Sequence, residues 1–382
     1  MADKHELSES GDIRILAAEL RELIRTARHL AARSVNRVQV LTNFEIGRRI
    51  VEFEQQGKRR AEYGKNLLKK LSNELTAEFG RGFSEDNLSL MRRFYLVYGE
   101  QISETVSRKL FSPTKSQALS DFLQKSETVS RKSIETDKDF DALRMFTLSW
   151  SHYVFLIGIK NADERSFYEI EATEQNWSLR ELKRQYQSGL YERLALSRDK
   201  ESVRKLAKEG QVVTNPEDLL KEPYVLEFLG LEKKERYSES DLETAVIDKI
   251  EHFLLELGKG FLFEARQKRF TFDEEHFFID LVFYNRILRC YVLIDLKIGK
   301  LTHQDLGQMQ MYVNYFDRFV KRDDENPAVG IILCKQKNKA LVEITLPQEA
   351  NIHAREYQLY LPDKEQLRRK LLVWVAEQED RP

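Results

Sequence analysis

The stretch FFIDLVFYNRILRCYVLIDLK, residues 277–297, holds two apolar runs separated by a polar turn at Asn285 and Arg286. Its β-branched and aromatic residues predict a β-hairpin. Each run nevertheless carries an aspartate, Asp280 in the first and Asp295 in the second. Because an unpaired carboxylate in an apolar strand costs several kcal/mol, both side chains require partners such as a lysine, water or a cation.

The second run also carries a lysine close to its aspartate. Side chains alternate along a strand, so Asp295 and Lys297 point to one face and Leu296 to the other. Two carboxylates suit Mg²⁺ or Mn²⁺, which also accept water and phosphate oxygens. Such an ion can supply a hydroxide nucleophile, while a lysine orients the water or stabilises developing charge. The pattern therefore indicates phosphodiester hydrolysis.

The turn sets a geometric condition on this interpretation. A two-residue turn at Asn285 and Arg286 would place Asp280 opposite Tyr291 and separate the aspartates by about 13 Å, at roughly 3.3 Å per residue. A longer loop or a β-bulge that shifts the register by two or four residues would bring them together on the same face. A metal site therefore predicts such a shift.

The segments around the hairpin predict an α/β sheet with an antiparallel start. A helix before the hairpin is expected to stop at Gly258 and Gly260, since glycine readily ends helices. The expected elements are a helix at 239–257, strands at 261–272, 277–284 and 287–296, a helix at 303–321, strands at 328–334 and 356–361, and a closing helix from residue 363.

The first half of the chain has helical periodicity. Apolar residues recur at three- and four-residue spacing from Ile13 to about Tyr98, with a GRGF turn before Ser84, a candidate N-cap. A segment rich in Ser, Thr, Lys and Gln follows and repeats SETVSRK at 103–109 and 126–132. An exact repeat without an apolar period predicts a flexible linker.

Together these boundaries predict an α+β chain of two domains, one helical and one with a mixed sheet. The expected regions are helices at 10–99, a linker at 100–141, further helices at 142–215, a linker helix at 216–237 and the α/β domain at 238–382.

Charge points to nucleic acid locally but not over the whole chain. The net charge is −1, yet residues 14–93 hold 17 Lys and Arg against 10 Asp and Glu. Two basic patches lie on predicted helices, the first in a helix-turn-helix-like pair. They are candidate DNA contacts, although solvated helical faces are an equally open explanation. The residues are Arg92, Arg93, Arg180, Lys183 and Arg184.

The remaining composition predicts a cytoplasmic protein. Cys290 and Cys334 are too few for a disulfide framework or a cysteine-based zinc site. The N-terminus lacks the apolar core of a signal peptide, and no apolar run approaches the roughly 20 residues of a membrane span.

An acid in one strand, D-X-K in the next and a preceding helical glutamate resemble the core of the PD-(D/E)XK nucleases. In the following helix, GQMQMYVNY matches the QxxxY element of their RecB-like branch. The chain as a whole resembles the YhcG family of bacterial proteins, through phrases such as ARQKRF, FIDLVFYN and LKIGKLTHQDLGQM. The resemblance implies a restriction-endonuclease-like C-terminal domain and a DNA-binding helical half.

The resemblance also implies roles for individual residues. Asp280, Asp295 and Glu243 would bind the metal, with Glu251 as a competitor for the helical position. Lys297 would complete the catalytic set. Gln308 and Tyr312, one helical turn apart, would contact the DNA backbone or brace the lysine. No proline precedes Asp280, which departs from the generic motif.

The main hypothesis is a Mg²⁺- or Mn²⁺-dependent DNA endo- or exonuclease in repair, recombination or defence against foreign DNA, with proteins of those processes as partners. A homodimer would supply two sites for two strands, but no residue pattern marks an interface. The alternative is a non-catalytic nucleic-acid-binding or assembly protein on the same scaffold. It predicts Asp280 and Asp295 more than about 8 Å apart, too far for one ion with ligand bonds of roughly 2 Å.

The site residues also have purely structural interpretations. Histidines beside the hairpin lack the spacing of transition-metal ligands. The structural interpretations are an Asp280 paired with Arg266 or Arg289, a solvated Lys297, a polar Gln308, a core Tyr312, and surface positions for His276 and His303.

Overall fold

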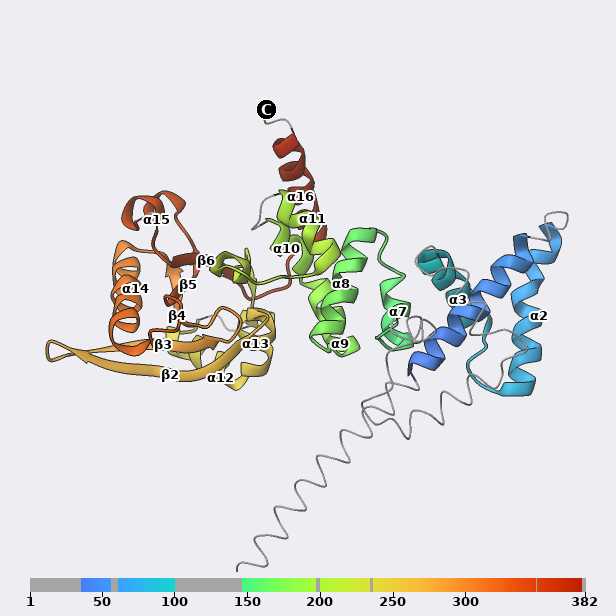
Figure 1. Cartoon of the computed structure of the whole chain (residues 1–382), viewed down its shortest axis with the longest axis horizontal. Coiled ribbons are helices and arrows are strands. Elements are labelled where there is room, and N and C mark those ends of the chain that lie inside the picture. Colours follow the sequence, from blue (N-terminus) through green and yellow to red (C-terminus); the bar gives the residue numbers. More distant parts are fainter. Residues whose placement is uncertain are drawn as a thin grey trace, which may run out of the picture. The chain divides into compact units, whose positions relative to one another are not determined.

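The computed structural model describes residues 36–55, 61–99, 146–196, 200–233, 236–347 and 349–379. The chain divides into two compact units, Met1–Lys160 and Asn161–Pro382 (Figure 1). The linker expected at 100–141, and the start of the first expected helix, lie outside the described residues.

The first unit is helical, as its periodicity predicts. Residues 36–55 form a helix, followed by α2 (Ala61–Phe79), α3 (Glu85–Tyr98) and α7 (Trp150–Leu156). The Ser84 side chain accepts a hydrogen bond from the Asn87 backbone and so caps α3, which confirms the predicted N-cap. The core of the unit is a cluster of aromatic rings that pack edge-on or tilted, among them Phe44, Phe94, Phe146 and Tyr153.

The second unit contains a six-stranded mixed sheet in the order β1-β6-β5-β4-β3-β2. Strands β2, β3 and β4 pair antiparallel, whereas β4, β5, β6 and β1 pair in parallel. The mixed sheet and antiparallel start confirm the expected fold. The strands are β1 (Tyr224–Val225), β2 (Phe261–Phe272), β3 (Glu275–Asn285), β4 (Cys290–Lys300), β5 (Val329–Gln336) and β6 (Ile352–Gln358).

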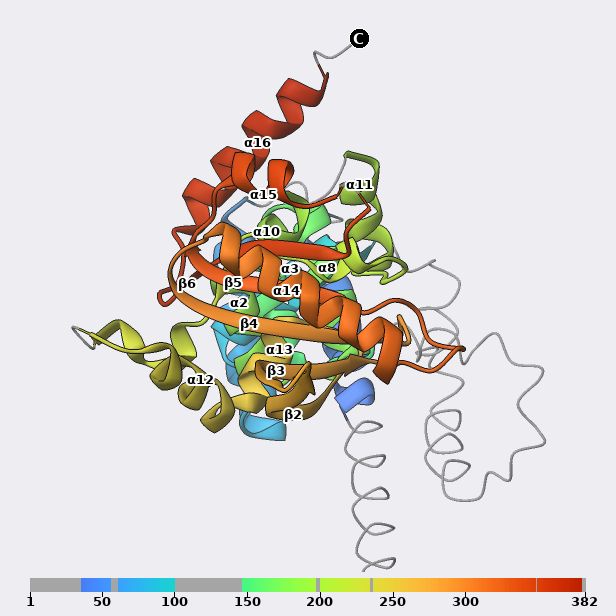
Figure 2. The same cartoon turned by 90° about the vertical axis from the view of Figure 1, so that its left-hand side faces the viewer.

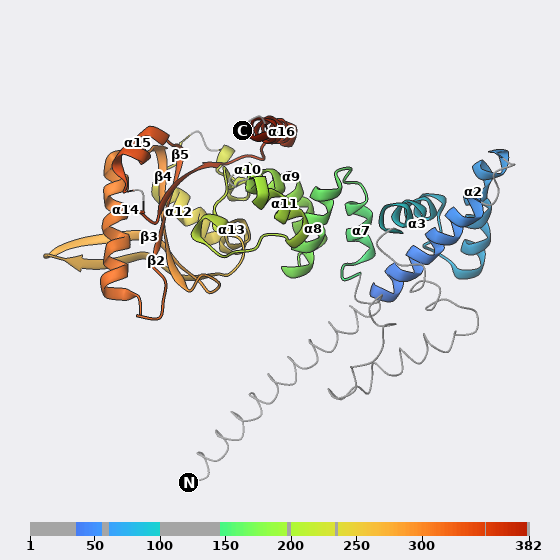
Figure 3. The same cartoon turned by 45° about the horizontal axis from the view of Figure 1, so that its top comes forward.

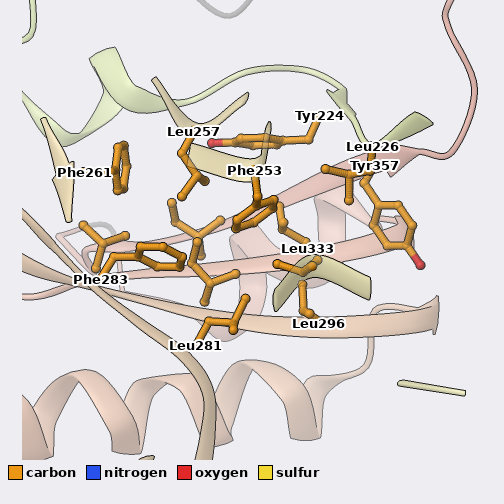
Figure 4. Close-up of a cluster of buried hydrophobic side chains, with 14 of the residues drawn as sticks. Tyr224, Leu226, Phe253, Leu257, Phe261, Leu281, Phe283, Leu296, Leu333 and Tyr357 are labelled. Atoms are coloured by element: carbon orange, nitrogen blue, oxygen red, sulfur yellow. The ribbon is translucent and has the colours of Figure 1, made fainter. Parts of the chain in front are cut away.

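Helices cover both faces of this sheet, which explains why its central strands are apolar on both sides. On one face α12 (Glu239–Asp248) and α13 (Ile250–Leu257) bury Phe253 and Leu257 against Phe283 and Leu333 (Figure 4). On the other face lies α14 (His303–Tyr315), which contributes Met309 to a second core (Figure 2).

Several elements differ from the sequence-based expectation. The helix expected at 239–257 breaks at Lys249, whose φ of −120° and ψ of 31° are not helical. The helix expected at 303–321 becomes a π-helical turn, η7, at Phe316–Val320. The prediction of a linker helix at 216–237 is wrong, because no α-helix forms in the described part of that segment. It forms 3₁₀ turns and β1, which pairs with β6, an outcome consistent with two prolines that interrupt helical hydrogen bonding.

The helices at 161–209 group with the sheet rather than with the N-terminal helices expected from 142–215. Buried Arg193 on α10 forms an ion pair with buried Glu256 on α13. Lys259 likewise reaches Glu171 on α8, with 2.8 Å between nitrogen and oxygen. Figure 3 shows these helices beside the C-terminal helix. They are α8 (Ala162–Glu174), α9 (Leu179–Gln187), α10 (Leu190–Leu196), α11 (Lys200–Glu209) and, at the C-terminus, α16 (Lys364–Glu379).

No helix in the described part of the chain is long and apolar enough to cross a membrane.

Candidate active site

A four-residue loop sets the register of the β3–β4 hairpin. Asn285 pairs with Cys290, leaving residues 286–289 as the loop, and pairing continues to Leu281 opposite Ile294. The Asn285 side-chain oxygen accepts hydrogen bonds from the backbone of Ile287 and Leu288, each 3.0 Å long. Relative to a two-residue turn, this loop shifts the register by four residues. The predicted shift is therefore confirmed, and a longer loop rather than a bulge produces it.

This register places Asp280 opposite Asp295, at the next position of the ladder. There the backbone pairing stops, and the Asp280 carboxylate accepts a hydrogen bond of 2.8 Å from the Leu296 backbone N–H. Asp295 is 2% exposed. Burial, and then the neighbouring charge of Asp280, raise the pKa of Asp295 to about 7. The hairpin thus holds two interacting carboxyl groups, one of them desolvated.

Lys297 supplies the positive charge beside this pair. Its Nζ lies 2.9 Å from Asp295 Oδ2 and about one ångström farther from two other acids, 3.9 Å from Glu239 and 4.0 Å from Asp305. Burial opposes the charged form, but the Asp295 carboxylate outweighs it and raises the pKa of Lys297 above its usual range. The lysine is therefore an ammonium at neutral pH.

Glu243 reaches the site through an intermediate residue. It is buried on α12 and accepts hydrogen bonds from the Arg266 guanidinium and, at 2.6 Å, from the Gln267 amide. The same Gln267 nitrogen donates to Asp280 at 3.0 Å. The competing acid, Glu251, is exposed.

Gln267 is a site residue that the sequence reasoning missed. Its φ of 46° is unusual for a residue other than glycine, and it lies on β2 between Arg266 and Lys268, which pair with Leu281 and Ile279. This conformation directs its amide toward both Glu243 and Asp280. Gln267 lies within ARQKRF, but a glutamine in a polar strand gives no sign of such a role.

Gln308 and Tyr312 meet each other, as their spacing predicts, but Tyr312 does not face solvent. Gln308 donates a hydrogen bond to the Tyr312 hydroxyl, which donates to the Phe278 carbonyl at 2.7 Å. The tyrosine is fully buried. Burial, followed by the Asp295 charge, raises its pKa to about 12. Tyr312 therefore braces β3 two residues before Asp280 and has no exposed surface for DNA.

The structure does not pair Asp280 with an arginine. Arg266 binds Glu243, and Arg289 binds Asp324 at 2.8 Å. The structural interpretation of Asp280 as one half of a simple ion pair with either arginine is therefore wrong.

The donor set fits one hard divalent cation. Asp280 and Asp295 contribute carboxylate oxygens, and Asp295 Oδ2 is buried with the Lys297 ammonium 2.9 Å away but without a hydrogen bond of good geometry. Such an oxygen keeps a lone pair for a metal ion. Among the described residues, no group of three His, Cys, Asp or Glu side chains could hold a metal, so Glu243 does not join the pair. Water and substrate oxygens would fill the other positions, as Mg²⁺ prefers.

The basic residues fall into two groups. Arg184 is bound by Glu227 at 2.8 Å and lies over the Phe228 ring, and Arg92 pairs with Glu54 at 2.7 Å. Carboxylates hold both guanidinium groups. The Arg184 side chain is largely buried and offers little surface to DNA, whereas Arg92 is partly exposed and remains a predicted contact. The exposed members of the two patches are Arg93, Arg180 and Lys183.

His276 lies at the start of β3 and interacts with neighbouring strand residues. Its ring contacts Thr271 at 2.9 Å and Arg269 at 3.3 Å. His303 is exposed at the start of α14. Both positions agree with the expected surface role.

Two family models match the chain. The "YhcG PDDEXK nuclease domain" matches residues 217–372, which include the hairpin and α14, and the "DUF1016 N-terminal domain" matches residues 19–193. The chain is 41% identical over 355 residues to "Putative nuclease YhcG" of Escherichia coli (strain K12), covering 92% of this chain and 91% of the relative.

Solved structures show a weaker likeness. A "repair endonuclease from Pyrococcus abyssi" is 17% identical with a TM-score of 0.22, covering 34% of this chain and 50% of the other. The "EndoMS-dsDNA2 complex" is 15% identical with a TM-score of 0.24, covering 34% and 48%. From the two family models and the match along nearly its whole length, the chain belongs to the YhcG family and carries a PD-(D/E)XK nuclease domain.

Proposed function

We propose that the chain is a DNA nuclease that depends on Mg²⁺ or Mn²⁺, with Asp280, Asp295 and Lys297 as its catalytic residues. One observation carries the proposal: the four-residue loop sets two carboxylates across from one another and beside an ammonium group. Placing two carboxylates side by side in an apolar hairpin does not stabilise the fold by itself, so the arrangement points to chemistry.

Asp280 and Asp295 would hold the ion. When bound, it would polarise the scissile phosphate and make an attacking water more acidic. The Leu296 N–H and the Gln267 amide each donate to one oxygen of Asp280, so this carboxylate is held in a fixed orientation. Lys297 remains charged and would donate to a phosphate oxygen or to the attacking water, and it would not act as a general base.

The residues around this centre act through position. Gln267 would hold the Asp280 carboxylate at a set angle, and buried Glu243 would hold Gln267. Tyr312 would fix β3 through its bond to the Phe278 carbonyl. We assign Glu243, Gln308 and Tyr312 to this support of the centre.

DNA is the proposed substrate because water activated at a metal centre needs no 2′-hydroxyl group. Exposed Arg93, Arg180 and Lys183 are the proposed phosphate contacts. We place the activity in the cytoplasm, in repair, recombination or defence against foreign DNA, with proteins of those processes as partners. A homodimer would let two sites act on two strands.

Cleavage of linear, circular and branched DNA with Mg²⁺ or Mn²⁺ tests the proposal. Lys297→Ala should lower the rate by about 10²–10⁴-fold, the range for loss of a group acting on the transition state. Lys300→Ala, an exposed lysine on the same strand, is the matched control. Equal residual activity in wild type and Lys297→Ala would disprove the catalytic assignment.

A further inference from the structure

A groove of about 350 Å³ lies between β2 and α14, apart from the carboxylate pair. Its walls are aromatic, with Phe270 and Phe272 from β2 and Tyr315 and Phe319 from the end of α14 and the π-helical turn. Phe272 is 58% exposed and Phe319 is 65% exposed. Large aromatic rings left open on both walls of one groove mark a binding surface.

The groove adjoins the candidate active site through one ring. Phe270 stacks on Tyr315 with 4.1 Å between centroids and packs edge-on against Tyr312 at 5.6 Å. Tyr312 is in turn bonded to the backbone of β3 at Phe278. Figure 1 shows the β2–β3 hairpin running past α14, so one hairpin forms the groove wall and carries Asp280.

The polar atoms of the groove define what could bind there. Gln310 Nε2 donates to Asn314 at 3.2 Å, but Gln310 Oε1 is buried and accepts no hydrogen bond within the described part of the chain. Because water does not reach this oxygen, a ligand in the groove could hydrogen-bond to the Gln310 amide only if this side chain turned toward the groove. Arg318, the charged residue of the lining, is exposed at the same groove.

We propose that this groove binds an unpaired nucleobase of the DNA strand beside the cleavage site, an inference that rests on the proposed nuclease function. The base would stack against Phe272 and Phe319, and the Gln310 amide, once turned toward the groove, would hydrogen-bond to its edge. Arg318 would contact the adjoining phosphate. The volume suits a small planar ligand better than a protein surface, because pockets for small ligands begin near 300 Å³.

Gly307 offers a way to close the groove without disturbing the core. It lines the groove, and a Cβ added there would meet no atom within 4 Å. Gly307→Leu should therefore fill the groove from the α14 side. Gly307→Ala keeps the groove open and is the matched control. Phe319→Ala removes a stacking face from an exposed position.

The test uses DNA duplexes with one unpaired 2-aminopurine, and fully paired duplexes, bound with Ca²⁺ in place of Mg²⁺. Wild type and Gly307→Ala should quench the fluorescence of the unpaired 2-aminopurine. They should bind the duplex that carries it about tenfold more tightly than the fully paired duplex, which is the contribution of one base–aromatic stack. Gly307→Leu and Phe319→Ala should no longer quench the fluorescence of the unpaired base or prefer the duplex that contains it. Both variants should still bind the fully paired duplex.

An unchanged preference of Gly307→Leu for the duplex with an unpaired base would overturn the inference. A different result tests the proposed nuclease function, which fails if wild type neither binds nor cuts any duplex. The groove inference fails if wild type binds and cuts duplexes but Gly307→Leu behaves like Gly307→Ala.

Discussion

Asp280 and Asp295 lie across from one another on β3 and β4, and burial together with the Asp280 charge raises the pKa of Asp295 to about 7. The Lys297 ammonium lowers the pKa of Asp295 but does not outweigh burial and the Asp280 charge, so the two carboxylates destabilise the fold unless a further cation binds. The pair therefore favours binding of a cation at some cost to the free energy of unfolding.

Asp295→Asn should show this trade-off. Replacing one carboxylate by an amide removes like-charge repulsion, so the variant should be more stable than wild type by about 1–3 kcal/mol in EDTA at pH 8, while losing cleavage. Urea unfolding and a cleavage assay measure the two effects. Glu264→Gln, an exposed acid on β2, should change neither. A less stable Asp295→Asn would contradict this account.

Gln267→Ala should slow cleavage by about 10–100-fold with little change in DNA affinity. The amide bridges Glu243 and Asp280, and loss of such outer support typically has an effect of this size. Single-turnover rates and equilibrium binding separate the two quantities. Lys268→Ala, the next residue on β2, serves as the control, and an equal rate in both variants would remove Gln267 from the site.

Asn285→Ala tests the loop that sets the register. The side chain bonds Ile287 and Leu288 and donates to the Lys259 carbonyl at 3.0 Å, and Asn285 is fully buried. Leaving these backbone groups unpaired should lower the free energy of unfolding by about 1–3 kcal/mol. Arg286→Ala, an exposed neighbour, should have no effect in urea. If the two variants unfold alike, the loop does not depend on Asn285.

The lowered pKa of Glu256 determines how the free energy of unfolding should change with pH. Burial alone would raise its pKa, but Arg193, Lys221 and Arg184 outweigh it and lower the pKa to about 2. Because the folded pKa lies below the unfolded value near 4.5, the carboxylate stabilises the fold above pH 4.5, and this contribution is lost as the pH falls toward 2.

Glu256→Gln should therefore cost about 3 kcal/mol at pH 7, with the difference from wild type shrinking between pH 4.5 and 2. Urea unfolding of the full chain, monitored by tryptophan fluorescence across this pH range, measures the difference in the free energy of unfolding for the unit at residues 161–382. The control is Glu251→Gln, an exposed acid on the same helix. A difference that does not vary with pH would contradict the assignment.

The sequence predicted the parts of the site that depend on local pattern. Alternation placed Asp295 beside Lys297, helical spacing placed Gln308 beside Tyr312, and the metal hypothesis required a register that the structure contains. Gln267 could not be found in this way, because its role comes from a positive φ and from two partners on other elements.

Long-range pairing explains the other differences. The break between the compact units falls at 160/161 because α8 and α10 bind Lys259 and Glu256, which are far away in the chain. Arg184 looks basic and amphipathic in the sequence, yet Glu227 and Glu256 neutralise it in the fold. Composition near a residue cannot reveal such partners.

The central claim is that Asp280 and Asp295 together bind one divalent cation. Mn²⁺ binding to the full chain tests this claim without any substrate. Isothermal titration calorimetry and the electron paramagnetic resonance signal of free Mn²⁺ both measure the binding. The account predicts one site in wild type and in Glu251→Gln, and its loss in Asp280→Asn and in Asp295→Asn. Equal Mn²⁺ affinity in wild type and both asparagine variants would contradict it.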